Sequence, residues 1–171
     1  MKKIISLILA LTMLLCVFVL SSCESDSVIN FGSDPNVNSI KIPKEKEFYN
    51  IVDQTKDLLD IVADDIYSYW YNCIYKDMYL NDISFAVASA KTDNEANINI
   101  IEENTTKIKA LYKEIKDGKL SAEAKAVMQA YNDYYTLIVE VSGSFKSYSE
   151  SKETCKKELA SAIDDFSFEL D

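Results

Sequence analysis

The carboxylates are the side chains of this chain that are best suited to chemistry. The sequence holds 28 Asp and Glu residues, and Asp53, Asp57, Asp60 and Asp64 recur at spacings of four, three and four. On a helix this spacing places all four on one face, where carboxylate oxygens could collect Ca²⁺ or Mg²⁺. A calcium loop would also need ligands at alternate positions and a glycine, which are missing here. We therefore expect a solvated acidic face and no metal site.

Paired carboxylates could also act as the acid and the nucleophile of a glycoside hydrolase. The acids are scattered along the chain, however, and such enzymes need a cleft in a larger fold. The sequence contains no His, which rules out a Ser-His-Asp triad, a Cys-His pair and a His-ligated metal. A carboxylate-dependent hydrolase is thus the least favoured function, and we predict no catalytic residue and no cofactor.

The overall charge argues against two classes of partner. All 18 basic residues are Lys and the formal net charge is −10. Without Arg the chain lacks the guanidinium group that forms bidentate hydrogen bonds with phosphates and guanines. Its negative charge also repels nucleic acid and anionic lipid surfaces. No nucleic-acid partner is expected.

The first 23 residues have the anatomy of a targeting signal. Lys2 and Lys3 precede the apolar stretch 4–20, and the segment closes on Leu20-Ser21-Ser22-Cys23. This ending resembles the lipobox of bacterial lipoproteins. The resemblance implies that a diacylglycerol, with fatty acyl chains such as palmitate, is attached to the Cys23 sulfur and that Cys23 becomes the mature N-terminus. An uncleaved membrane anchor is the alternative interpretation.

The resemblance sets the expected domain organisation and localisation. Residues 1–22 form a signal peptide, residues 23–43 form a lipidated tether rich in Ser, Asp and Asn, and residues 44–171 form the folded domain. The protein is expected on the extracytoplasmic face of the cell membrane or outer membrane, and its membrane partner is reached through Cys23.

Apolar residues at steps of three and four predict three long helices. The first follows Pro43 and carries its apolar stripe from Phe48 to Cys73. The second starts at Asn81-Asp82 and ends at Asp117-Gly118; we favour a continuous helix over a break near Thr92. The third starts with Ser121 as its cap and keeps a heptad-like stripe to the end of the chain, with Gly143 as a possible bend. The predicted fold is all-α, an elongated three-helix antiparallel bundle with coiled-coil-like packing.

Six aromatic residues gather in residues 67–79, at the far end of the first helix. They form either a layer packed over small alanines or an exposed platform for a sugar, a peptide or a helix. A third helix that overshoots the turn near Asn81 would add two phenylalanines there. The predicted partner or ligand surface therefore comprises Tyr67, Trp70, Tyr71, Tyr75, Tyr79, Phe166 and Phe168.

Two cysteines remain in the folded domain. In the three-helix topology Cys73 and Cys155 lie on parallel helices, offset by about six residues or ~9 Å. A disulfide needs Cα atoms within about 7 Å, so slippage or a bend at Gly143 would allow one. Two buried thiols are the alternative.

These features predict a lipid-anchored, extracytoplasmic helical bundle that acts as a binding or scaffold module at the cell envelope. Its partner would be an unknown envelope protein or a second copy of the chain. The alternative is a receptor for a small ligand or a glycan that uses the aromatic platform.

Overall fold

A computed structural model describes residues 42–170 of the chain, which divides into the units Met1–Ile40 and Lys41–Asp171. The predicted signal peptide, Cys23 and the tether up to residue 41 lie outside the described residues. Within residues 42–170 helices are the only regular secondary structure, and no strand is present. Its elements are α2 (Lys44–Tyr75), the 3₁₀ turn η1 (Tyr79–Asn81), α3 (Ile83–Asp93), α4 (Glu95–Ile115), α5 (Ser121–Val139) and α6 (Phe145–Phe168).

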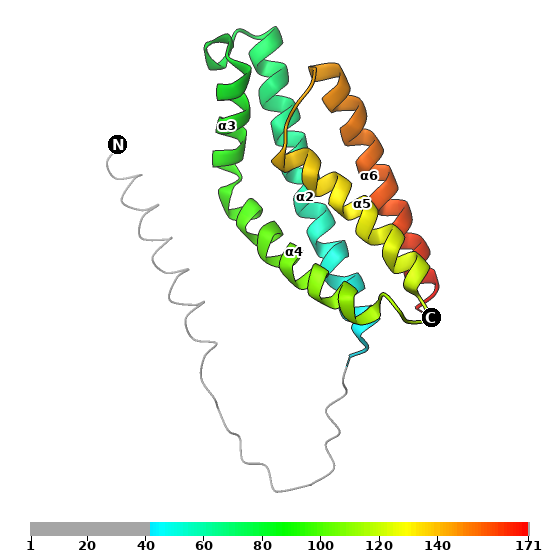
Figure 1. Cartoon of the computed structure of the whole chain (residues 1–171). Helices are drawn as coiled ribbons and strands as arrows, with labels where there is room; N and C mark the ends of the chain where they lie inside the picture. The colour runs from blue at the N-terminus through cyan, green and yellow to red at the C-terminus, as the bar shows by residue number, and fades with distance from the viewer. Residues whose placement is uncertain (1–41, 171) are drawn as a thin grey trace, which may run out of the picture. The chain divides into compact units, whose positions relative to one another are not determined.

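Helix α2 is the centre of the bundle and contacts all four other α-helices of the described domain. Helices α3 and α4 run back along one side of it as a bent arm, and α5 and α6 pack together on the other side (Figure 1). Helix α6 runs antiparallel to α2, so that its first residues lie near the end of α2 and its last residues near the start. The observed bundle is all-α, as predicted, but it is not a three-helix bundle.

The predicted third helix is in fact two helices, α5 and α6, that fold back on each other. Gly143 adopts φ +85° in the linker between them, a backbone conformation that glycine reaches without steric cost. Ser144 then starts α6 with a capping box, in which its side chain accepts from the Ser147 N–H and the Ser147 hydroxyl accepts from the Ser144 N–H. The helix is therefore interrupted between Val139 and Phe145, although the apolar spacing continues across the break. The prediction of one long third helix is wrong.

The predicted continuous second helix is also wrong, because it breaks at Asn94 between α3 and α4. The buried Asn94 amide donates to the Asp65 carboxylate on α2 at 2.8 Å and to the Ala90 carbonyl at 3.1 Å. The bend is thus fixed by a polar contact with the central helix, without any Gly or Pro. Thr92 provides no cap, since its hydroxyl donates back to the Ala88 carbonyl.

Several predicted boundaries are confirmed. Helix α2 starts directly after Pro43, and Asp82 caps α3 by accepting from the Phe85 N–H at 3.1 Å. Helix α4 ends where the Gly118 N–H donates to the Ile115 carbonyl at 2.9 Å. Ser121 is only the first residue of α5, however, and makes no cap.

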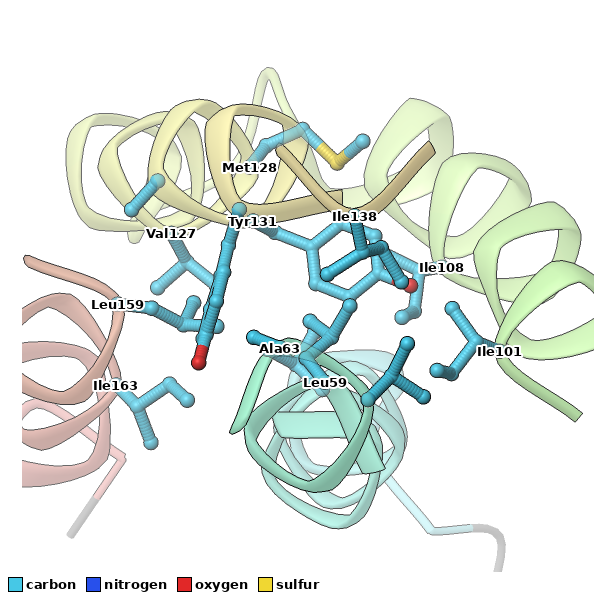
Figure 2. Packing of buried hydrophobic residues seen from close by; sticks show 14 of the residues in the cluster. Leu59, Ala63, Ile101, Ile108, Val127, Met128, Tyr131, Ile138, Leu159 and Ile163 are labelled. Atoms are coloured by element: carbon cyan, nitrogen blue, oxygen red, sulfur yellow. The ribbon is translucent and has the colours of Figure 1, made fainter. Parts of the chain in front are cut away.

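The core is a continuous set of aliphatic and aromatic side chains around α2 (Figure 2). Leu59 and Ala63 from α2 face side chains that come from α4, α5 and α6. One buried polar pair crosses it, where the hydroxyls of Thr105 and Tyr131 lie 2.6 Å apart. Because the pair satisfies both hydroxyls, it fixes the approach of α4 to α5 at little energetic cost.

Candidate functional site

The most unusual surface of the domain is its apolar tip, which we define as residues 71–85 at the end of α2, through η1 and into α3. Among residues 42–170 twelve large apolar side chains are exposed, and seven of them lie in this short segment. Leu80 is 88% exposed and Tyr75 is 62% exposed. Apolar side chains clustered in this way mark interaction sites more often than isolated ones do. The seven are Tyr71, Ile74, Tyr75, Met78, Leu80, Ile83 and Phe85.

The backbone of the tip is held in an unfavourable conformation. Asp77, Tyr79, Leu80 and Asn81 all have positive φ, between 51° and 57°, and none of them is glycine. Each such residue costs on the order of 1 kcal/mol or more. Hydrogen bonds from the Asn81 N–H to the Met78 carbonyl and from the Asp82 N–H to the Tyr79 carbonyl hold the turn. The strained residues thus form a turn that directs Leu80 into solvent.

Aromatic rings brace the tip from both sides. On the α6 side, Tyr67 stacks on Phe145 with centroids 4.9 Å apart, and Tyr71 lies against Tyr75 at 4.8 Å. On the α3 side, the Tyr79 ring stacks on Tyr69 at 5.0 Å. Phe145, the first residue of α6, also lies 6.2 Å from Tyr71 and 6.0 Å from Tyr75 between ring centroids, so the start of that helix is joined to the tip by ring contacts.

The structure separates the seven residues predicted to form the surface. Tyr71 and Tyr75 are exposed at the tip, and Tyr79 is half-buried there. Tyr67 is half-buried beside the tip, one turn earlier on α2. Trp70 is 3% exposed and belongs to the core.

Phe166 and Phe168 lie at the opposite end of the bundle, since α6 runs back toward the start of α2. Phe166 is fully buried and packs edge-on against Phe48, with centroids 5.5 Å apart, while Phe168 is exposed. The expected overhang of the third helix beyond Asn81 does not exist.

Sequence reasoning missed five of the seven exposed residues, namely Ile74, Met78, Leu80, Ile83 and Phe85. A signal for them was present, because apolar residues immediately flank the helix-start pair Asn81-Asp82. Turns lie on the surface, so apolar side chains beside a predicted turn are expected to be exposed.

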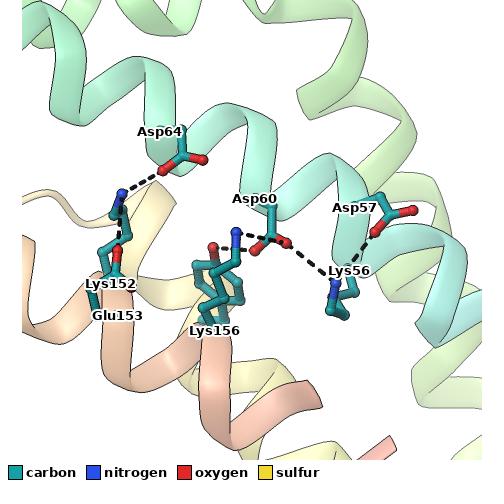
Figure 3. A network of polar contacts seen from close by, with 8 residues as sticks. Lys56, Asp57, Asp60, Asp64, Lys152, Glu153 and Lys156 are labelled. Atoms are coloured by element: carbon teal, nitrogen blue, oxygen red, sulfur yellow. Dashed lines mark hydrogen bonds and ion pairs between the residues drawn. The ribbon is translucent and has the colours of Figure 1, made fainter.

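The acidic face of α2 is an ion-pair network with α6 (Figure 3). Asp60 pairs with Lys156 at 3.2 Å and with Lys56 at 3.3 Å, and it accepts a hydrogen bond from the Tyr134 hydroxyl at 2.7 Å. Burial alone would raise the pKa of Asp60, but these donors outweigh it and lower the pKa. Asp57, Asp60 and Asp64 are thus engaged with lysines. Residues 42–170 contain no cluster of three or more Cys, Asp or Glu side chains arranged to hold a metal.

Lys152 is the charged residue on the heptad-like stripe, and it is paired rather than free. Its ammonium contacts the Asp64 carboxylate and lies 4.8 Å from the centroid of the Tyr67 ring. Burial would lower the pKa of Lys152, but the hydrogen bonds and negative charges of Asp64 and Glu153 together outweigh burial and raise the pKa. Lys152 therefore stays charged and ties α6 to α2.

The thiols of Cys73 and Cys155 are free. The contacts of Lys152 with Asp64 and of Lys156 with Asp60 place Cys155 about twelve residues below Cys73 along α2, or ~18 Å. A disulfide cannot span that distance, so the possible bond is not formed. Burial, with Asp133 and Glu158 nearby, raises the pKa of Cys155, which disfavours the reactive thiolate.

Comparison of the chain with protein-family models, with curated proteins and with solved structures finds no significant match. Across residues 42–170, no helix has the length and apolar character needed to cross a bilayer. The case for a function therefore rests on the surfaces described above and on the resemblance at Cys23.

Proposed function

We propose that this protein is a lipid-anchored binding module on the extracytoplasmic face of the cell membrane or outer membrane, and that it holds a partner protein of the envelope through its apolar tip. The observation that carries the proposal is the concentration of exposed apolar side chains in residues 71–85. The lipid anchor rests on the lipobox-like ending at Cys23.

A partner would gain from covering the tip. Burial of apolar surface contributes roughly 25 cal/mol per Å², and Leu80 and Tyr75 present most of their surface to solvent. Aromatic side chains are also enriched among the residues that dominate binding energy at interfaces. The strained turn and the braced rings present these groups in a fixed arrangement, which limits the entropy lost on binding.

The position of the tip suits a tethered module. The predicted tether joins the domain at Pro43, and the tip lies at the other end of the 32-residue helix α2. The helix is thus ~48 Å long. The proposed contact surface and the junction with the tether therefore lie at opposite ends of α2.

The chemistry of the tip favours a protein over other partners. Lys76, Asp77 and Asp82 give it charges of both signs, so it has no strong field of its own. The chain as a whole has a net charge of −10, which disfavours nucleic acid and anionic lipid. The complementary surface is an apolar groove on a partner protein.

A glycan receptor on the aromatic rings has less support. A sugar stacks on a flat, open ring face. Here Tyr67, Tyr71 and Tyr75 all pack against Phe145, and Tyr69 packs on Tyr79, so that the rings are engaged with one another. The paired rings act as braces for the tip.

The proposal is tested at Leu80, whose φ of 57° and ψ of 20° lie in the left-handed region. Asn tolerates this conformation better than Leu, so Leu80→Asn should leave the fold intact while it removes the most exposed apolar group. Ile100→Asn on α4 is the matched control, because Ile100 is an exposed apolar residue outside the tip.

The readout is photocrosslinking in intact cells with a benzophenone amino acid at position 78, because Met78 is exposed in the tip. We expect a discrete adduct in the parent chain and in Ile100→Asn, and we expect Leu80→Asn to abolish it. An equal adduct in Leu80→Asn, or its loss in both variants, would contradict the proposal. An adduct between two copies of the chain would show that the tip binds a second copy and not another envelope protein.

A further inference from the structure

A pocket of about 410 Å³ lies beside the tip, between α3 and the linker that joins α5 to α6. It is separate from the exposed face of Leu80 and Tyr75. Its wall combines residues from three segments that are distant in the sequence, and its main lining residues are Trp70, Ile83, Val87, Lys91, Val141 and Ser142.

Trp70 brings an aromatic ring to this wall. The residue is 3% exposed, and its indole Nε1, which has no hydrogen-bond partner among residues 42–170, is itself buried. The indole therefore contributes apolar surface to the pocket.

Lys91 is the only charged residue that lines the pocket. Its ammonium donates to the Val139 carbonyl at 2.7 Å, which leaves two further N–H groups. No carboxylate of residues 42–170 lies within ion-pair distance of Lys91, although acids outnumber lysines in the chain. A half-buried cation without a counter-charge favours an anionic ligand.

Most of the remaining wall is aliphatic, from Ile83, Val87, Ala88 and Val141, with two serines, Ser84 and Ser142, beside it. Pockets of this size with an apolar lining and few polar groups are typical of small-molecule sites. The single ammonium of Lys91 matches the charge of a carboxylate, and the apolar lining matches an aliphatic chain. We propose that this pocket binds a small carboxylic acid, with its carboxylate on the Lys91 ammonium and its aliphatic chain against Ile83, Val87 and Val141.

The chain provides its own reporter, because Trp70 is its only tryptophan. The complete chain in dodecyl maltoside micelles is titrated with hexanoate while tryptophan emission is recorded. Hexanamide and hexylammonium are the comparison probes, since they keep the chain length and change the head group. We expect a saturable emission shift with hexanoate, at least tenfold weaker binding of hexanamide, and no saturable response to hexylammonium.

Two variants locate the site. Lys91→Met removes a charge-assisted hydrogen bond and should weaken hexanoate binding by about 10- to 100-fold. Lys146→Met is the matched control, because Lys146 is an exposed lysine on α6, and it should bind hexanoate normally. Ala88→Phe fills the pocket from its exposed rim, leaves Lys91 in place and should abolish the emission shift. Far-UV circular dichroism checks that each variant remains helical.

Three results would overturn the inference. Equal affinity for hexanoate and hexanamide would show that no anion is recognised. Unchanged hexanoate binding by both Lys91→Met and Ala88→Phe would show that hexanoate binds elsewhere on the chain or enters the micelle. The absence of any saturable response up to about 10 mM would show that the affinity falls below the useful range.

Discussion

Two phenylalanines near the end of α6 allow a sharp test of the fold. Phe166 has no exposed surface, whereas Phe168, two residues later, is 81% exposed. Deleting a buried Phe side chain costs about 3–5 kcal/mol, and substitution of an exposed residue usually changes stability by less than about 0.5 kcal/mol. Phe166→Ala should therefore lower the free energy of unfolding by about 3–5 kcal/mol, while Phe168→Ala leaves it nearly unchanged.

The measurement is urea unfolding of the complete chain in micelles, followed both by far-UV circular dichroism and by Trp70 emission. The two probes should give coincident transitions with a common slope for the parent and both variants, so that the midpoints report stability alone. Similar losses for Phe166→Ala and Phe168→Ala would refute the burial of Phe166.

A double-mutant cycle tests the direction of α6. Phe166 meets Phe48 with ring centroids 5.5 Å apart, which is possible only if α6 turns back toward the start of α2. Phe48→Ala and Phe166→Ala should thus show a coupling energy of at least about 0.5 kcal/mol. In one continuous helix from 121 to 170 the two rings would lie at opposite ends of the bundle, and their effects would add. Strict additivity would refute the α5–α6 hairpin.

Three further predictions follow from single sites. Cys23→Ala should yield protein without acyl chains, and mass spectrometry of the N-terminal peptide of the parent should show a modified Cys23. Gly143→Ala should lower the free energy of unfolding by about 1–3 kcal/mol, measured by urea unfolding, because it places an L residue in a left-handed conformation with its Cβ 2.8 Å from the Ser147 hydroxyl. The lowered pKa of Asp60, which accepts from Tyr134, means that its ionised form stabilises the fold at neutral pH and that this contribution is lost as the pH falls below 3.8. Asp60→Asn should accordingly flatten the loss of stability in acid, monitored by circular dichroism, relative to the parent chain.

Much of the local structure followed from the sequence. The start of α2 after Pro43, the turn near Asn81 and the cap at Asp82 each depend on one or two residues with strong local preferences. The alternation of steps of three and four correctly indicated which residues of α2, α5 and α6 face the core. These features are local, and a short stretch of chain contains all the information they need.

Local sequence preferences did not determine the direction of the chain after Val139. The apolar stripes of α5 and α6 join without a phase shift, so the same spacing fits one long helix or two that fold back on each other. The choice depends on what each option buries. The hairpin lets Tyr134 and Tyr148 both reach α2, donating to the Asp60 carboxylate and the Ala63 carbonyl.

The candidate site, too, was determined partly by the sequence and partly by the tertiary structure. The sequence alone determined that aromatic residues gather at the end of α2, and it contained the lipobox-like ending at Cys23. Only the tertiary structure decided that Trp70 is buried while its neighbour Tyr71 is exposed, because the rings of Phe145 and Tyr148 arrive from α6 and close over the indole. Periodicity states which side of a helix meets the core, but the exposure of each side chain depends on which other helix comes to lie against it.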